Sequence, residues 1–347
     1  MSEQININTT SHQSSLKACA ACHRVFQVPV HWPVIACPVC QQAQLIPVTT
    51  GGNPPAIELI LKPNLNPENL HDRLTQFCKG TPFAVPDLNP ENLMNRILLL
   101  YWPMWLTDAD LNGEWDAVFG YEYQVESTRE QMGGSGWSSQ KVIKTRIKEE
   151  PRKGFINRHY DNLISPALHT HQERLSQIGA YDINTMSAFQ GGVFGQNIIE
   201  VNTLWPKDLD DFVKQELSKL ASRDAQKAAD AQHPKTFTYY GEFNNFHWTQ
   251  AIMPIFTCFY EDEKGTRQAI AVNGQTGQVY GRRMASMKKA WLLTGILLVI
   301  ATIIMLVLYF IIKDFSLCAA SAFILAFIPA IRASTWNSKE KTKPPMA

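Results

Sequence analysis

Residues 290–312 read AWLLTGILLVIATIIMLVLYFII, and this stretch decides the class of the chain. It carries no charge over 23 residues and is interrupted only by Thr294, Gly295 and Thr302. As a helix it would be about 34 Å long, at roughly 1.5 Å per residue. That length crosses a hydrocarbon core of roughly 30 Å. We therefore expect a transmembrane helix rather than the core helix of a soluble protein.

A second apolar run, FSLCAASAFILAFIPAI at 315–331, follows after only Lys313 and Asp314. Its 17 residues lie at the short end of the spanning range, so the sequence leaves open whether it crosses fully. We expect a two-helix transmembrane hairpin over 290–331. Small residues suited to close helix packing, and hence to a homo-oligomer, lie in this run at Ala319, Ala320, Ser321 and Ala322.

Basic residues flank both outer ends of the expected hairpin. They are Arg282, Arg283, Lys288 and Lys289 on one side and Arg332, Lys339, Lys341 and Lys343 on the other. Basic loops resist translocation, so both ends are predicted to be cytoplasmic. No apolar segment opens the chain as a signal peptide would. We expect a cytoplasmic body over 1–289, an anchor, and a cytoplasmic tail over 332–347.

The overall composition excludes some classes of protein. The chain holds 32 Lys and Arg against 31 Asp and Glu, a balance that gives no support to a whole-protein nucleic-acid binder. Its seven cysteines face a reducing compartment, which argues against a disulfide framework.

Four cysteines instead have the spacing of metal ligands. Cys19 and Cys22 form one C-x2-C pair, and Cys37 and Cys40 form a second after fourteen residues. Two such pairs direct four thiolates at one ion, so we predict a zinc ribbon over 16–48, with iron as the minor alternative. Zinc binding is worth on the order of 10–16 kcal/mol, enough to fold so small a module.

The predicted ribbon carries few cations, namely Lys17 and Arg24 besides the histidines His23 and His31. These are too few for a phosphate track, so protein contact is the favoured use. The two histidines are expected at the surface or behind the ligands. The remaining cysteines are expected as buried thiols, at Cys78, Cys258 and Cys318.

The body is predicted to be α+β, with a disordered tail over 1–15, a linker over 49–60 and one domain over 61–289. The motif LNPENL occurs at 65–70 and again at 88–93. Asn as cap, Pro at the first position and Glu in the first turn predict two short helices, the second ending near Leu100. A longer helix is predicted over Pro206–Gln232.

A β pattern starts at Tyr101, with a flexible hairpin loop over Gln131–Ser139. Later strands are expected over Thr236–Tyr240, Ala251–Tyr260, Arg267–Val272 and Gln278–Tyr280. The turn at Asn273–Gly277 has residues that tolerate positive φ. Internal Pro103 and Pro254 suggest edge strands.

No catalytic constellation is recognisable. The stretch GQTGQVYG at 274–281 lacks the Gly-Lys-Ser/Thr ending of a phosphate loop. Four carboxylates could bind a cation, but solvated groups beside a turn at Asn112–Gly113 are favoured; these are Asp108, Asp110, Glu114 and Asp116. The histidines His159, His169 and His171 are expected at the surface. We expect no catalytic residue and no cofactor besides the metal.

The layout resembles the bacterial zinc-ribbon membrane proteins labelled "TFIIB-type zinc ribbon-containing" or "primosomal helicase-like". Besides the ribbon and the hairpin, the similar blocks are YWPMWLTDAD at 101–110, RHYDNL at 158–163, PIF at 254–256 and VNGQTGQVYG at 272–281. The chain departs from the family at Phe256, a common Trp, and at Met284 and Ala285, where Pro is usual. Without a nucleotide-binding loop the helicase label does not fit.

The resemblance implies a bacterial inner-membrane protein that recruits soluble partners, such as phage-shock-type coat proteins and flotillin-like (SPFH) or virion-core-like proteins. It supplies no catalytic residue. We therefore favour a non-enzymatic membrane adaptor. The alternatives are an enzyme with an unfamiliar site around Asp108–Asp116 and His159, and a membrane-tethered nucleic-acid-binding ribbon.

Overall fold

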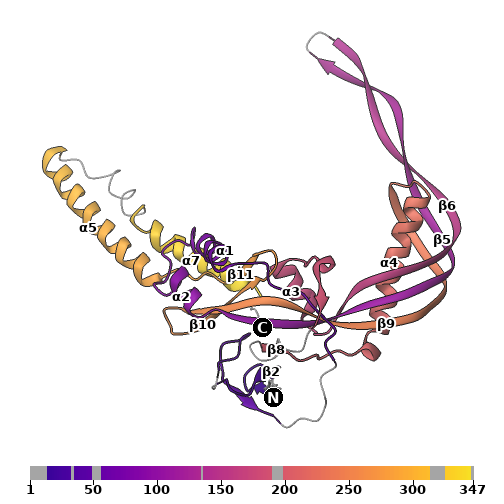
Figure 1. The fold of residues 1–347 in the computed structure, drawn as a ribbon. Coiled ribbons are helices and arrows are strands. Elements are labelled where there is room, and N and C mark those ends of the chain that lie inside the picture. Colours follow the sequence, from indigo (N-terminus) through magenta and orange to yellow (C-terminus); the bar gives the residue numbers. More distant parts are fainter. Residues whose placement is uncertain are drawn as a thin grey trace, which may run out of the picture. The chain divides into compact units, whose positions relative to one another are not determined.

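The computed structural model describes residues 14–32, 35–48, 56–133, 136–189, 198–312 and 325–344. They form a mixed α and β structure that is rich in strands (Figure 1). The strands are β1 (Ser14–Cys19), β2 (Val25–Pro29), β3 (Leu45–Pro47), β4 (Leu59–Ile60), β5 (Leu98–Gly133), β6 (Gly136–Pro166), β7 (Ser187–Ala188), β8 (Ile198–Glu200), β9 (His233–Glu261), β10 (Arg267–Asn273) and β11 (Val279–Gly281). The helices are α1 (Pro67–Cys78), α2 (Pro90–Asn95), α3 (His171–Ile178), α4 (Asp210–Ala228), α5 (Met287–Ile312) and α7 (Ile328–Thr342), with short 3-10 turns η1 (Ile183–Thr185) and η3 (Pro206–Asp208).

Several predicted segments lie outside the described residues. These are most of the tail over 1–15, residues 49–55 of the linker, and residues 313–324 with Cys318 and the small-residue run Ala319–Ala322. The α+β class and the strand-rich centre are confirmed. The second helix of the hairpin stays a prediction, because the described chain resumes just before α7.

The chain forms two compact units, where the sequence suggested one domain over 61–289. Unit 1 contains Met1–Pro103, Leu168–Thr203 and Ala251–Ala347, and unit 2 contains Met104–Ala167 and Leu204–Gln250. The long strands β5 and β9 each contribute residues to both units.

Unit 1 extends the strands of the predicted ribbon into a larger sheet. The strand order is β11-β10-β9-β5-β8-β2-β1-β3, with β8 parallel to β5 and antiparallel to β2. Helices α1 and α2 contribute Leu74 and Leu93 to a core with Tyr260 and Ile270 of the sheet. The N-terminal module is therefore joined to the sheet by the pairing of β2 with β8.

The two LNPENL motifs begin helices as predicted. The Asn66 side chain accepts a hydrogen bond from the Asn69 N–H at 2.7 Å, and Asn89 accepts one from Asn92 at 2.9 Å. The second helix, however, ends at Asn95 and not near Leu100. Residues from Leu98 onward form β5, because pairing with β8 and burial of the following side chains override local helix propensity.

Unit 2 packs helix α4 on a sheet made from β5, β6 and β9. The helix contributes Val213, Leu217, Ala221 and Ala225, spaced four apart, to a core with Trp115 and Phe119 of β5. Strand β9 runs without a break through residues 233–261, where two separate strands were predicted.

Two local predictions in β5 and β6 are wrong. The hairpin loop at Gln131–Ser139 is much shorter, since the strands pair up to Gly133 and Gly136. Asn112–Gly113 is no turn, because both residues pair within β5 and β6. Gly113 is required instead by close approach: a Cβ there would lie 2.4 Å from the Gly241 Cα.

The prolines do not mark edge strands, since β5 and β9 both lie inside the sheet order. Pro103 falls between the β5–β8 pairing, which ends at Tyr101, and the β5–β6 pairing, which begins at Met104. Pro254 similarly falls between Ile252, paired with β4, and Ile255, paired with β10. A missing N–H is tolerated where one ladder gives way to another.

The turn after β10 is confirmed and explains the NGQTG block. The Asn273 side chain accepts hydrogen bonds from the N–H groups of Gln275 and Thr276, at 2.9 and 3.0 Å. Gly277 takes the positive φ, at 74°. The Gln275 side chain donates to the Asp182 carbonyl at 3.0 Å. The NGQTG block, which is the most specific part of the resemblance, therefore has a structural role within unit 1.

Candidate metal centre and membrane helix

The four predicted ligand cysteines lie together in the structure. All four Sγ atoms lie within 4.8 Å of one another, with Cys19 to Cys40 at 3.5 Å and Cys22 to Cys37 at 3.7 Å. Tetrahedral Zn–S bonds of about 2.3 Å would place sulfurs about 3.8 Å apart. The cluster could therefore hold a metal ion such as zinc.

Backbone N–H groups point at every sulfur of the cluster. Ala21 donates to Cys19 at 3.4 Å, Arg24 to Cys22, Val39 and Cys40 to Cys37, and Gln42 to Cys40. Such bonds favour the thiolate, the form that binds a metal. The four thiols are coupled: the hydrogen bond from the Cys37 thiol lowers the pKa of Cys22 to about 5, while the same bond raises the pKa of Cys37 and burial raises that of Cys40 to about 11.

Each cysteine pair closes with a residue in the left-handed region. His23 follows Cys22 with φ 58°, and Gln41 follows Cys40 with φ 58°. Glycine adopts this conformation without steric cost, whereas His and Gln do not. Both histidines of the module are exposed and lie outside the sulfur cluster, as expected for His23 and His31.

A buried ion-pair group fixes the module to the rest of unit 1. The Glu200 carboxylate of β8 accepts from Arg24 at 3.0 Å and from Arg174 of α3 at 2.7 and 3.1 Å. Arg174 also lies over the Trp102 ring, 5.2 Å from its centroid. Burial raises the pKa of Glu200 to about 7, and Arg24 opposes that rise. Sequence reasoning missed this group, because its members are far apart in the chain.

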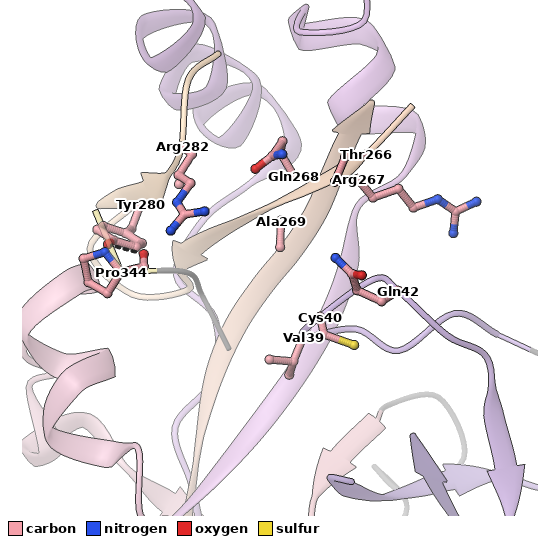
Figure 2. A pocket seen from close by; sticks show the side chains of 11 residues that line it. Val39, Cys40, Gln42, Thr266, Arg267, Gln268, Ala269, Tyr280, Arg282 and Pro344 are labelled. Atoms are coloured by element: carbon pink, nitrogen blue, oxygen red, sulfur yellow. Dashed lines mark hydrogen bonds between the residues drawn. The ribbon is translucent and has the colours of Figure 1, made fainter. Parts of the chain in front are cut away.

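The second cysteine pair lies against strand β10 of the same unit. The Gln41 carbonyl accepts from Arg267 at 3.4 Å. A pocket of about 170 Å³ remains between the two, and Figure 2 shows Val39, Cys40 and Gln42 on one side of it and Ala269 on the other. The cysteine cluster therefore contacts the rest of unit 1 beside both of its C-x2-C pairs, through Arg24 next to the first pair and through Gln41 next to the second.

The apolar segment over 290–312 forms helix α5, as predicted. Among the described residues, Met287–Val307 is the one helix long and apolar enough to cross a membrane. Only 17% of its most apolar window is buried, whereas the core helix of a soluble protein would be mostly covered. Exposed side chains include Leu292, Val299 and Ile303. This is evidence for membrane association by length and composition.

The start of α5 is capped by a carboxylate from the β9–β10 loop. Glu263 accepts from the N–H groups of Met287 and Lys288, at 3.0 and 3.1 Å, and from the Ser286 hydroxyl. Ser286 in turn accepts from the Lys289 N–H at 3.0 Å. A negative charge at a helix N-terminus satisfies free donors and complements the helix dipole.

Helix α7 packs beside the start of α5. Asn337 exchanges two hydrogen bonds with the Ala285 backbone, at 2.7 and 3.0 Å. The Arg283 backbone donates to Glu340 at 2.9 Å, and its guanidinium lies over the Trp336 ring at 5.1 Å. The residues that precede the apolar region in the chain are therefore hydrogen-bonded to those that follow it.

Of the three histidines expected at the surface, His159 and His169 are exposed, whereas the prediction for His171 is wrong. His159 lies between two carboxylates, with Nδ1 2.5 Å from Asp110 and Nε2 2.8 Å from Asp161, and Asp110 also accepts from Asn245 at 2.6 Å. Asp110 raises the pKa of His159. His171 is buried at 3% exposure, whereas His169 is exposed as expected.

The other candidate residues do not gather into a second metal site. Among the described residues, only the four cysteines bring three or more potential ligands together. Asp108 accepts from the Asn162 N–H, Asp116 pairs with Lys153, and Glu114 is exposed. Of the remaining thiols, Cys258 is buried and Cys78 half-buried.

Comparisons of the chain with family models, curated proteins and solved structures gave no match. The assignment to the zinc-ribbon membrane proteins stays a prediction from the blocks quoted above.

Proposed function

We propose that this protein is a non-enzymatic adaptor that presents a metal-stabilised surface at the cytoplasmic face of a membrane. The observation that carries the proposal is the construction of unit 1. Glu200 of its sheet pairs with Arg24 of the cysteine module and with Arg174 of α3. Glu263, in the loop between two strands of the same sheet, accepts a hydrogen bond at the start of α5. A rigid connection between an anchor and a contact surface is what recruitment of a soluble partner requires.

The return of the chain beside α5 supports a hairpin anchor. If α5 crosses the bilayer, the contacts of α7 with Ala285 and Arg283 place the chain on both sides of the apolar region at one membrane face. A second crossing by the apolar run 315–331 would satisfy this. With the basic residues that flank the region, that face would be the cytoplasm, and the chain would be a multi-pass inner-membrane protein.

The edge strand β3 is the surface we assign to the partner. It ends the strand order of the sheet, and its Ile46 side chain is 52% exposed. Val30, in the same module, is 53% exposed. An open strand edge with apolar side chains suits addition of a partner strand. The resemblance suggests phage-shock-type or SPFH-type proteins as partners, with zinc as a structural ion.

Pull-down of the full protein from detergent-solubilised membranes tests this function. We would compare the natural chain, a Cys37→Ser variant that loses a metal ligand, and an Ile46→Lys variant that keeps all four. Copurifying proteins would be identified by mass spectrometry. Leu292→Ile, in the apolar helix, serves as the matched control.

Stoichiometric partners that are lost with both variants and kept by the control are the expected result. Retention of every partner by Cys37→Ser and Ile46→Lys would overturn the assigned role of the module. Turnover of a nucleotide, lipid or peptide that Asp110→Asn abolishes would instead favour the enzymatic alternative.

A further inference from the structure

The far part of the β5–β6 hairpin forms an arm within unit 2, which we define as residues 121–133 and 136–148. Strand β9 begins only at His233, next to Gly120, and among the described residues no other strand pairs with the arm beyond that point. Figure 1 shows the arm extending past the end of α4. A two-stranded hairpin alone is marginally stable in water, so a covering surface would stabilise it.

One face of the arm is basic. Directly opposed residues lie on the same face of a pair of strands, and alternate residues follow along each strand. The pairs Tyr121↔Lys148, Tyr123↔Arg146 and Val125↔Lys144 therefore share one face, which also carries Arg129. No carboxylate of the arm lies on this face.

The opposite face is acidic and aliphatic. Here Glu122 opposes Ile147, Glu126 opposes Ile143, and Glu130 continues the row. The aliphatic side chains are exposed, Ile143 at 64% and Ile147 at 46%. Lys141 is the one cation, and its pair with Glu126 at 3.7 Å is between highly exposed groups.

The two faces match each other row by row. Lys144 and Lys148 are four residues apart on β6, and Glu122 and Glu126 are four apart on β5, so both pairs span about 13 Å. If β6 of one basic face lies over β5 of another acidic face, each lysine meets a glutamate. Lys148 then exchanges its partner within the chain, Glu150 at 2.9 Å, and Glu122 exchanges His233 at 2.6 Å. Val125 and Tyr123 then lie over the row of Ile143 and Ile147, while Tyr121 stays packed against the core of unit 2, where its hydroxyl donates to the Ala229 carbonyl.

We propose that the arm is a self-association surface on which the basic face of one copy packs on the acidic face of a second copy of this chain. The contact uses different patches on the two copies, so it is heterologous. Repetition produces a ring or an open chain of subunits rather than a closed two-fold dimer.

A second copy fits the arm better than a nucleic acid does. An anionic polymer would cover the cations and the tyrosine rings, but it would leave Ile143 and Ile147 in water and lie close to a row of glutamates. A second copy covers both faces with complementary groups. Nucleic-acid binding is therefore an outcome that the test must detect.

The test uses the full chain in detergent and charge reversals on each face. The variant with Lys144→Glu, Arg146→Glu and Lys148→Glu makes both faces acidic, and the variant with Glu126→Lys and Glu130→Lys makes both basic. Arg223→Glu with Lys227→Glu on the exposed side of α4 is the matched control. Masses are measured by analytical ultracentrifugation over a range of concentrations and salt.

We expect the natural chain and the control to associate beyond a dimer, and each arm variant alone to associate at least about tenfold more weakly. Mixing the two variants should restore association. The basic face of the first variant has become acidic, and it then meets the acidic face of the second variant, which has become basic. A chain that carries all five reversals should associate like the natural protein. This rescue also shows that the variants fold.

Three results would overturn the proposal. One is a natural chain that stays monomeric over the measured range, and another is association that neither reversal weakens, which would place it at the apolar helix. The third is a high mass that collapses on nuclease treatment, which would assign the basic face to nucleic acid.

Discussion

His171 is a buried histidine whose two ring nitrogens have no hydrogen-bond partner among the described residues. It lies against the Trp102 ring, with centroids 5.8 Å apart. Burial lowers its pKa from 6.5 to about 4, so the ring is neutral in the folded protein at pH 7. Below pH 6.5 the unfolded chain binds a proton at this residue before the folded chain does.

This residue should make unit 1 sensitive to acid. Stability is present above pH 6.5 and falls by on the order of 3 kcal/mol as the pH drops toward 4, because each pKa unit is worth about 1.4 kcal/mol. His171→Phe keeps a ring beside Trp102 and should flatten this part of the stability profile. Denaturant unfolding from pH 7 to pH 4 measures it, with exposed His169→Phe as the control. An unchanged slope in His171→Phe would contradict the assignment.

His159 should titrate above the usual range for histidine, because its ring is hydrogen-bonded to Asp110. Its favourable charge interaction is present below the unfolded pKa near 6.5 and is lost as pH rises through the higher folded pKa. Asp110→Asn should return the midpoint of the His159 NMR titration toward 6.5. Asp116→Asn, which removes a carboxylate paired with Lys153, should leave the midpoint in place.

Residue spacing was sufficient to predict the four ligands and both helix caps, since each depends on neighbours in the chain. It could not indicate the bonding of Glu200 to Arg24 and Arg174, because those contacts join separate elements. The surface prediction for His171 was wrong for the same reason: a burial that depends on α3 and Trp102 leaves no local pattern.

Among the elements, helix α5 depends on a contact outside itself at its N-terminus. Glu263→Gln should destabilise the first turn by about 1 kcal/mol, because a charged acceptor for free N–H groups is lost. Hydrogen exchange at Met287, Lys288 and Lys289 in detergent should become faster. Glu261→Gln, on an exposed side chain that pairs only with Arg267 at 3.4 Å, should leave exchange there unchanged.

The cysteine module should gain stability from glycine at its left-handed positions. Gln41→Gly removes the strain of a side chain at φ 58°, an effect of up to about 1 kcal/mol. Zinc affinity, measured by competition with a chelator, should rise up to several-fold. Gln42→Gly, one residue along, is the control and should not raise it. A lower affinity in Gln41→Gly would mean that its side chain has a binding role.

At the scale of the whole molecule, the sequence identified the kinds of part but not their division into units. Apolar length and cysteine spacing are strong local signals, so the apolar helix α5 and the clustering of the four cysteines were predictable. The division was not, because β5 passes from unit 1 into unit 2 and β9 passes from unit 2 into unit 1, and no local pattern marks either point. The continuous strand at Asn112–Gly113 was hidden because a glycine required by Gly241 resembles a turn signal.

Metal removal should affect the two units differently. Chelation should raise hydrogen exchange in β1, β2 and β8, whose pairing and ion pairs involve the cysteine module. Strands β5 and β6 within 104–119 and 150–166 should keep their protection, because their core with α4 is independent of it. Uniform loss of protection in both units would contradict this division.

The pairing of β2 with β8 links two equilibria that are usually measured separately. Phe26 and Gln27 pair with Glu200 and Ile199, so the sheet and the folded cysteine module stabilise each other. By thermodynamic reciprocity, a molecule that binds the sheet more tightly when the module is folded must tighten zinc binding by the same factor. The zinc affinity, measured by competition with a chelator, would then report on recruitment, and a bound ion would act as a reporter of occupancy at a surface that it does not touch.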